Sequence, residues 1–273
     1  MIDMKKKPVK IKICSSEEES WDTIWKWSWF TKELWISELW EEEKIALKPV
    51  FTLLSKWRIK SILDCSCGLG FKSVLFAKKG FEVEGSDASV IAIKHAPQLA
   101  KDEGVRIKFF HSSYEGLSKK CKRKYDCVYS DYFDETAEFK VLRKSAKGIF
   151  SVLKKGGKFI FCGALPKWTK NDLQKVIERE WKKRKKFDIL PAYEKDGVRM
   201  TSIEVDEKIP EGILENRIFL IEKQGVMRVE IAFMMNSRIK WTFKDYNNVL
   251  KGAGFRKVEC IKTDGQILNI GIK

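Results

Sequence analysis

The sequence has little histidine, and its cysteines lack the spacing of a metal site. There are two histidines and seven cysteines among 273 residues. Only Cys65 and Cys67 are close together, and their one-residue spacing differs from the two-residue spacing typical of zinc and thioredoxin sites. We therefore expect reduced, mostly buried thiols and no bound metal.

Long apolar runs are also missing. No stretch approaches the ~18 uninterrupted apolar residues that a membrane-spanning helix needs, and the first residues carry no signal-peptide-like apolar segment. Repeats and low-complexity tracts are absent from the sequence. We expect a cytoplasmic protein without a membrane partner, whose 44% hydrophobic content can form one large core, with room for a smaller insertion.

Positive charge is abundant. Lys and Arg number 54 against 38 Asp and Glu, a net charge of +16. Such a surplus attracts polyanions or anionic substrates, and its densest runs are residues 119–124 and 182–186. A heavily charged surface of a heat-tolerant protein explains the same composition. We favour surface charge and keep nucleic-acid binding as the alternative.

The N-terminal segment is rich in tryptophan. Six of the ten tryptophans lie between residues 21 and 40, and Trp21, Trp25 and Trp29 share one helical face. The pattern predicts a helical cap over residues 1–58, with one helix starting at Ser20 and another over residues 41–57. Most of these indoles should be packing residues.

From residue 59 the pattern alternates between short apolar runs and helical stretches, which predicts a doubly wound, Rossmann-like α/β core with a mostly parallel sheet. The expected strands are 61–65, 81–86, 106–110, 125–130 and 157–163, and the expected helices are 71–79, 89–101, 136–153 and 169–186. The core is assigned to residues 59–187 and 240–273. Residues 188–239, with β-branched runs between Gly and Pro turns, should form an antiparallel β insertion.

A glycine-containing loop follows the first core strand. Gly68 and Gly70 let the backbone turn tightly against a ligand, and Asp87 at the end of the next strand can accept hydrogen bonds from both hydroxyls of a ribose. Phe71 and Lys72 stand where a dinucleotide-binding loop prefers a third glycine, so a pyrophosphate fits less well.

These motifs resemble those of class I S-adenosylmethionine-dependent methyltransferases. The resemblance rests on residues 63–70, 86–89 and 153–157, and it covers about residues 61–164. Residues 64–96, which include the helical step Ile93-Lys94-His95-Ala96, are similar in particular to glycine and sarcosine N-methyltransferases. The resemblance implies S-adenosylmethionine as the cofactor. The cofactor-binding residues that it implies are Asp64, Ser66, Cys67, Gly68, Gly70, Asp87, Ala88, Ser89, Ser112, Ser113 and Ser130.

The acceptor side is expected after the fourth core strand, where Asp131 and Tyr132 face the methyl donor in this fold. Enzymes that methylate nucleobase amines usually carry two prolines there, and this chain has none. Asp131 is therefore expected to orient or deprotonate an amine, whereas Asp134 caps the helix near Thr136. Trp21, Trp25 and Trp29 would contribute a lid, whose indole faces attract cations.

We therefore expect methyl transfer by in-line SN2 displacement to the amine nitrogen of a small-molecule acceptor, which can be cationic. No nucleophilic side chain is needed for this reaction. Glycine itself is doubtful, because Glu41-Glu42-Glu43 stand where glycine-methylating enzymes place an arginine. The alternatives are an RNA methyltransferase that uses the basic surface, or a catalytically inactive cofactor-binding protein. A homo-oligomer is left open.

Overall fold

The computed structural model describes residues 9–263 and 266–273. The chain divides into two compact units: the described residues through Thr31 together with Lys175–Arg238, and Lys32–Gln174 together with Ile239–Lys273. The first N-terminal helix thus belongs to the unit that holds the β-rich segment, and the second helix belongs to the unit with the cofactor loop. The three-part division expected from the sequence stays a prediction, and its first eight residues lie outside those described.

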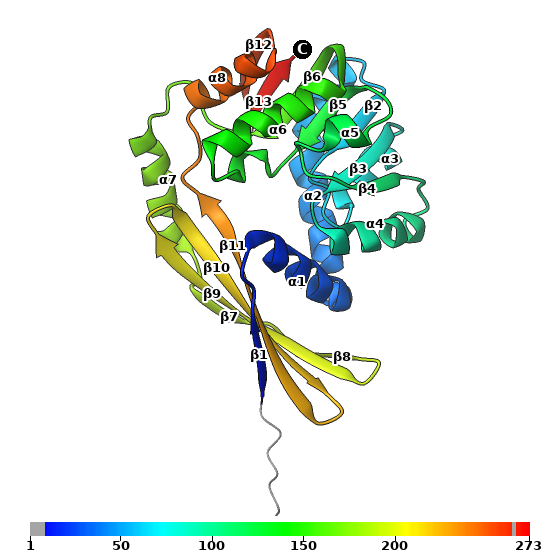
Figure 1. Ribbon diagram of the computed structural model, residues 1–273, viewed down its shortest axis with the longest axis vertical. Coiled ribbons are helices and arrows are strands. Elements are labelled where there is room, and N and C mark those ends of the chain that lie inside the picture. The colour runs from blue at the N-terminus through cyan, green and yellow to red at the C-terminus, as the bar shows by residue number, and fades with distance from the viewer. Residues whose placement is uncertain (1–8, 264–265) are drawn as a thin grey trace, which may run out of the picture. The chain divides into compact units, whose positions relative to one another are not determined.

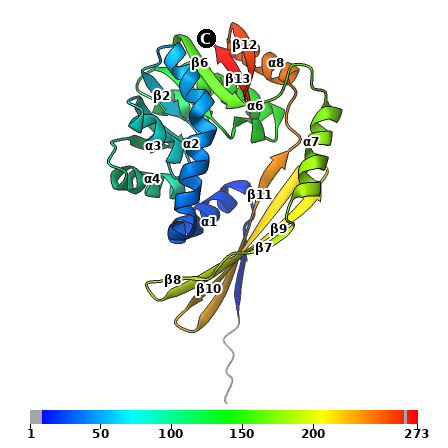
Figure 2. The same cartoon turned by 180° about the vertical axis from the view of Figure 1, so that it is seen from behind.

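The larger unit contains a mostly parallel sheet (Figures 1 and 2). Within the described residues its seven strands lie in the order β12-β13-β6-β5-β2-β3-β4. Their bounds are β2 Ser61–Asp64, β3 Glu82–Asp87, β4 Lys108–His111, β5 Tyr125–Ser130, β6 Leu153–Cys162, β12 Lys257–Lys262 and β13 Ile267–Ile272. Only β13 runs antiparallel to its neighbours β6 and β12 among these strands. The doubly wound α/β class is confirmed.

Helices cover both faces of this sheet, because side chains alternate along its buried strands. Leu63 packs into a cluster with α5, α6 and α8, whereas Ile62 packs into a second cluster with α2 and α3. The helices of this unit are α2 Lys32–Lys56, α3 Phe71–Lys78, α4 Val90–Asp102, α5 Leu117–Lys120, α6 Phe139–Val152 and α8 Phe243–Ala253, with the short 3₁₀ turn η1 Phe133–Glu135. Helix α7, Lys170–Lys183, crosses from this unit into the other.

Two expectations about local structure were wrong. The helix expected near Thr136 begins at Phe139, and Glu138 rather than Asp134 is its N-cap residue. Asp134 lies in η1, where it is fully buried. The first helix begins before Ser20, because the Ser16 side chain accepts a hydrogen bond from the Glu19 backbone N–H and caps the helix there.

The smaller unit is an antiparallel sheet with one helix on it. Strands β9 Val198–Ile209, β10 Gly212–Lys223 and β11 Val226–Arg238 form a meander, β7 Phe187–Ile189 and β8 Tyr193–Lys195 pair with β9, and β1 Lys10–Ile13 pairs in parallel with β11. Helix α1, Glu17–Phe30, lies beside β11 in both views (Figures 1 and 2). Its Ile24 and Trp27 form a buried cluster with Phe219 and Ala232 of the sheet.

Candidate functional site

The glycine loop connects β2 to α3 at the carboxyl end of the parallel strands. Gly68 and Gly70 have φ angles of 51° and 93°, a region that L side chains rarely adopt. A Cβ atom on Gly70 would also lie 3.0 Å from the Phe109 ring. The loop therefore requires glycine at Gly70, both for its backbone conformation and for the space beside Phe109.

Asp87 ends β3 and holds this loop. Its Oδ2 accepts a hydrogen bond from the Gly68 backbone N–H and its Oδ1 accepts one from the Ser89 backbone N–H, each at 2.8 Å. Burial raises the pKa of Asp87, and the two N–H donors oppose that shift. The expected ribose-binding acid thus lies beside the glycine loop.

Asp64, the last residue of β2, is fully buried. Its Oδ2 accepts a hydrogen bond from Ser73 Oγ at 2.6 Å, whereas its Oδ1 has no hydrogen-bond partner among the described residues. Burial raises the pKa of Asp64 to about 7. A buried carboxyl oxygen without a donor is suited to a cationic or N–H-bearing ligand, so this residue fits the positively charged methionine part of S-adenosylmethionine.

Hydroxyl groups join the loop to the end of β5. Ser66 Oγ and Tyr114 Oη each lie 2.9 Å from Ser130 Oγ, and Ser66 Oγ donates to Asp131 Oδ1 at 3.3 Å. The Phe133 backbone N–H donates to Ser130 Oγ at 3.1 Å. Ser66, Ser130 and Asp131 are thus brought together as expected, and Tyr114 is a further member that sequence reasoning did not identify.

Asp131 is paired with Lys72. The Lys72 ammonium lies 2.6 Å from Asp131 Oδ2 and also pairs with Glu43 of α2. Burial lowers the pKa of Lys72, but Asp131 and Glu43 outweigh it and the pKa is raised overall. Lys72 is therefore an ammonium ion between two carboxyl groups. Asp131 thus pairs with an ammonium group through Oδ2 and accepts a hydrogen bond from Ser66 through Oδ1.

Aromatic residues of α2 lie next to the loop. Trp40 and Trp35 contact Phe71, the first residue of α3, with ring centroids 4.6 and 5.8 Å apart. In the sequence, the feature that could have indicated these contacts is Phe71, an aromatic residue directly after Gly70. The predicted lid residues belong to the other unit, where Trp21 and Trp25 stack at 5.5 Å and Trp29 is half-buried. Their lid role stays a prediction.

The remaining predicted cofactor residues surround Asp87. Ala88 is exposed and its carbonyl oxygen lies 2.8 Å from His111 Nε2. Ser89 is buried and caps α4 through its hydroxyl, which accepts from the Ala92 backbone N–H. The other three differ in exposure: Cys67 and Ser112 are buried, and Ser113 is exposed.

Ser112 and Cys67 are engaged within the fold. The Ser112 backbone N–H donates to the Asp87 carbonyl oxygen at 2.9 Å and its hydroxyl donates to the Ser113 carbonyl oxygen at 2.8 Å. Burial raises the pKa of the Cys67 thiol. Ser113 thus has the more accessible hydroxyl of the serine pair, and Cys67 is a protonated thiol.

A second buried charge cluster follows Asp131. Lys240 pairs with Asp134 and lies 3.2 Å from Glu135 Oε1. Burial is the main cause of the raised pKa values of Asp64, Asp87 and Asp134, and the charge of Asp131 raises all three further. Carboxyl groups therefore outnumber ammonium groups near the carboxyl ends of the strands. The carboxyl groups are Glu43, Asp64, Asp87, Asp131, Asp134 and Glu135, and the paired lysines are Lys72 and Lys240.

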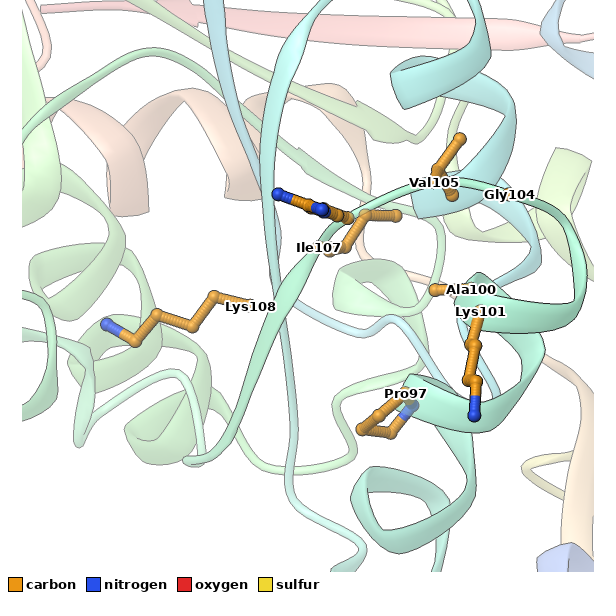
Figure 3. A pocket seen from close by; sticks show the side chains of 8 residues that line it. Pro97, Ala100, Lys101, Gly104, Val105, Ile107 and Lys108 are labelled. Atoms are coloured by element: carbon orange, nitrogen blue, oxygen red, sulfur yellow. The ribbon is translucent and has the colours of Figure 1, made fainter.

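The hollow at the other end of β4 has a different character. It has a volume of about 590 Å³ and is lined by the end of α4 and the approach to β4 (Figure 3). Lys101 and Lys108 on its rim point away from one another, and no acid or thiol lines it. The described residues also include no cluster of three or more His, Cys, Asp or Glu able to hold a metal, and none of the described helices is long and apolar enough to cross a bilayer.

Comparisons with known proteins bear on this site. Residues 62–157 match the family described as "Methyltransferase domain". A curated relative, ribosomal protein L11 methyltransferase from Nitratiruptor, is 30% identical over 128 residues, which are 44% of this chain and 43% of that protein. The chain thus matches less than half the length of that relative.

Solved structures show the same fold. The sugar N-methyltransferase KedS8 from Streptoalloteichus has a TM-score of 0.59 at 13% identity, with 81% of this chain and 84% of that chain covered. An S-adenosylmethionine-dependent methyltransferase from Clostridium acetobutylicum has a TM-score of 0.56 at 16% identity, with 82% and 88% covered. Residues 62–157 therefore match a methyltransferase domain, and the solved structures show that the larger unit has a class I methyltransferase fold.

Proposed function

We propose that this protein transfers the methyl group of S-adenosylmethionine to an amine nitrogen of a small-molecule acceptor. The observation that carries the proposal is the excess of carboxyl over ammonium groups at the carboxyl ends of β2, β3 and β5, within a chain whose net charge is +16. A site of that charge favours cationic ligands over polyanions.

The cofactor would be held by the loop and the acid after β3. Asp64 would face its positively charged methionine part, Gly68 and Gly70 would allow close approach of the backbone, and Asp87 would accept hydrogen bonds from its ribose. When bound, this cofactor supplies an electrophilic methyl group on a sulfonium. Ser112 or Ser113 would lie at the adenine side.

The acceptor would lie against Asp131 and Tyr132. Because Lys72 keeps Asp131 paired, this carboxylate is suited to accept a hydrogen bond from the acceptor N–H and to fix the direction of its lone pair. The acceptor nitrogen must be uncharged when it attacks, so an ammonium acceptor would first lose a proton to solvent. The methylated nitrogen would then carry the positive charge that the sulfonium loses. Trp35 and Trp40, next to Phe71, would limit the entry of water on that side.

Two features favour an amine over other acceptors. Residues 64–96 are similar to glycine and sarcosine N-methyltransferases, and the structural neighbour KedS8 is a sugar N-methyltransferase. Glycine itself is disfavoured, because Glu43 occupies the stretch where those enzymes carry an arginine, and Glu43 is engaged with Lys72. We therefore propose a cationic or neutral amine without a carboxylate next to it.

A macromolecular acceptor is the second candidate. The basic runs 119–124 and 182–186 favour RNA, and the curated relative is named for methylation of a ribosomal protein. Against RNA stands the acidic character of the candidate site.

The test is transfer of isotope-labelled methyl from S-adenosylmethionine to a panel of primary and secondary amines, including amino sugars and polyamines, beside total RNA and ribosomal proteins. We expect label in an amine product, with transfer reduced by roughly 100-fold or more in an Asp131→Asn variant. Label found only in RNA or protein would overturn the small-molecule proposal. Cofactor binding without turnover on any of these would favour the inactive alternative.

A further inference from the structure

The central rows on one face of the sheet in the smaller unit are apolar and hold no charged residue. Cross-strand register places five isoleucines in one row across all five strands from β1 to β7: Ile13, Ile231, Ile218, Ile203 and Ile189. Residues that are opposite each other in register share a face. None of the five belongs to a buried core cluster of the described residues. The row is therefore a continuous apolar stripe outside the core.

The rows on either side extend this stripe. One holds Ile11, Val229 and Leu220 with Thr201, and the other holds Phe233, Val205 and Phe187 with Asn216. No Asp, Glu, Lys or Arg occurs in the three rows, although 34% of the chain is charged. We call these three rows the isoleucine face.

The opposite face of the same sheet is different. Helix α1 packs there, with the Trp27 indole N–H donating to Glu230 at 2.8 Å, and charged residues such as Arg217 and Glu204 pair on it at 3.0 Å. On the isoleucine face, Ile11 and Ile13 are each 66% exposed, and Phe187 and Ile189 are 53% and 57% exposed. The sheet thus has one face covered by a helix and one apolar face open at both edges.

We propose that the isoleucine face binds the same face of a second copy of this chain, forming a two-fold symmetric dimer. A face whose centre is a row of one residue type is complementary to itself, as a two-fold interface requires. Sheets rich in β-branched residues pack face to face about 10 Å apart. The dimer would then complete a three-layer arrangement in each unit: helix, sheet and the sheet of the partner.

The size of the face is sufficient for a specific interface. Five strands about 4.8 Å apart and about six residues long span roughly 24 by 20 Å, or about 480 Å². This is as large as the largest apolar patch of a typical monomer, about 300–600 Å². Two such faces together bury about 1,000 Å², the lower limit for a specific interface. This is a flat area, and the uneven surface of the side chains adds to it. A membrane surface is a poorer occupant, because peripheral membrane sites combine apolar with basic side chains and this face has none of the latter.

The test is sedimentation of the full chain across a range of concentrations. We expect a species of twice the chain mass of 31.8 kDa. Ile218→Lys, at the centre of the face, should weaken the dimer about 100-fold or more, since it buries an unpaired charge. Ile13→Lys, at the edge, should weaken it less. The matched control is Ile45→Lys on α2, which changes an isoleucine 62% exposed in the other unit and should leave the dimer intact.

Circular dichroism establishes that each variant is folded. If Ile218→Lys does not fold, the proposal is tested with Ile13→Lys, because that side chain is 66% exposed. A wild-type monomer at the highest concentration would overturn the proposal, as would dimers unchanged in both face variants. A monomer that instead co-sediments with phosphatidylglycerol vesicles would assign the face to lipid and equally overturn it.

Discussion

The Lys72 ammonium lies 2.6 Å from Asp131 Oδ2 and joins the helix after the glycine loop to the residue that follows β5. Glu43 of α2 completes this group, so three elements meet at one lysine. This ion-paired group links the glycine loop to the proposed acceptor site.

Replacing this lysine should destabilise the fold. Lys72→Met leaves Glu43 and Asp131 partly buried without a counter-charge, and we expect a loss of roughly 1–3 kcal/mol in the free energy of unfolding, measured by urea denaturation at pH 7. Adding Glu43→Gln to Lys72→Met should restore part of the lost stability, because it removes one of the two unpaired carboxyl groups. Lys78→Met on the same helix, an exposed ion pair, should change stability by less than about 1 kcal/mol. Equal losses for both lysines would contradict the buried group.

Asp131→Asn should affect catalysis more than cofactor binding. The amide can no longer accept the same charged hydrogen bond, and we expect kcat/KM for an amine acceptor to fall by roughly 100-fold or more. The Kd for S-adenosylmethionine, measured by calorimetry on the same preparation, should stay nearly constant. A variant with full turnover would place the acceptor elsewhere.

Asp87→Ala should weaken the cofactor. The variant loses the proposed ribose acceptor and the carboxylate that holds the Gly68 and Ser89 N–H groups, so we expect about 1.5–3 kcal/mol less binding free energy. Asp102→Ala, at the exposed end of α4, serves as the control and should bind like the wild type. Undiminished binding by Asp87→Ala would remove this residue from the site.

Asp64 should make stability and cofactor binding depend on pH. Its pKa is about 7 in the folded chain against an ordinary value of 3.8, so the folded state holds a proton that the unfolded state has lost. Stability therefore falls as the pH rises from about 4 to 7. Asp64→Asn lacks this titration, so its stability relative to wild type should improve over the same interval in urea melts.

A cation bound next to Asp64 should drive out its proton. We expect S-adenosylmethionine binding at pH 6 to release a proton, measured by calorimetry in two buffers of different ionisation enthalpy, and affinity to rise up to about pH 7. Asp64→Asn should show neither effect. Binding that is independent of pH in the wild type would mean that Asp64 does not face the cofactor.

Gly85 should be intolerant of a side chain. A Cβ atom there would lie 2.5 Å from the Phe109 ring and 3.2 Å from Cys67 Sγ, so Gly85→Ala should cost roughly 1–3 kcal/mol in thermal or urea unfolding. Gly252→Ala in α8 meets nothing within 4 Å and should stabilise the helix by about 0.5–1 kcal/mol. A Gly85→Ala variant that is more stable than Gly252→Ala would contradict the packing around Phe109.

The sequence was informative where chemistry is local. The strand, glycine loop and helix at residues 61–78 and the acid Asp87 are near in sequence, and their periodicity and turns predicted their arrangement. Strand β1 was not predicted, because its four exposed residues alternate Lys and Ile and only pairing with β11, more than 200 residues later, makes them a strand. Strand β13 was also missed.

The rest of the site depends on tertiary pairing. Glu43 and Lys72 are 29 residues apart, and nothing in their local sequence indicates that α2 packs against the first turn of α3. Asp134 was expected to cap a helix, but it is buried with Lys240, a residue more than 100 positions away. Long-range ion pairs of this kind leave no periodic pattern in the sequence.

The most direct measurement is calorimetric titration of the purified chain with S-adenosylmethionine and, separately, with NADH. The geometry of Asp64, Gly68, Gly70 and Asp87 predicts saturable binding of S-adenosylmethionine, weakened in Asp87→Ala, and no binding of NADH. Binding of NADH alone would mean that the glycine loop holds a dinucleotide and would contradict the proposed methyl transfer.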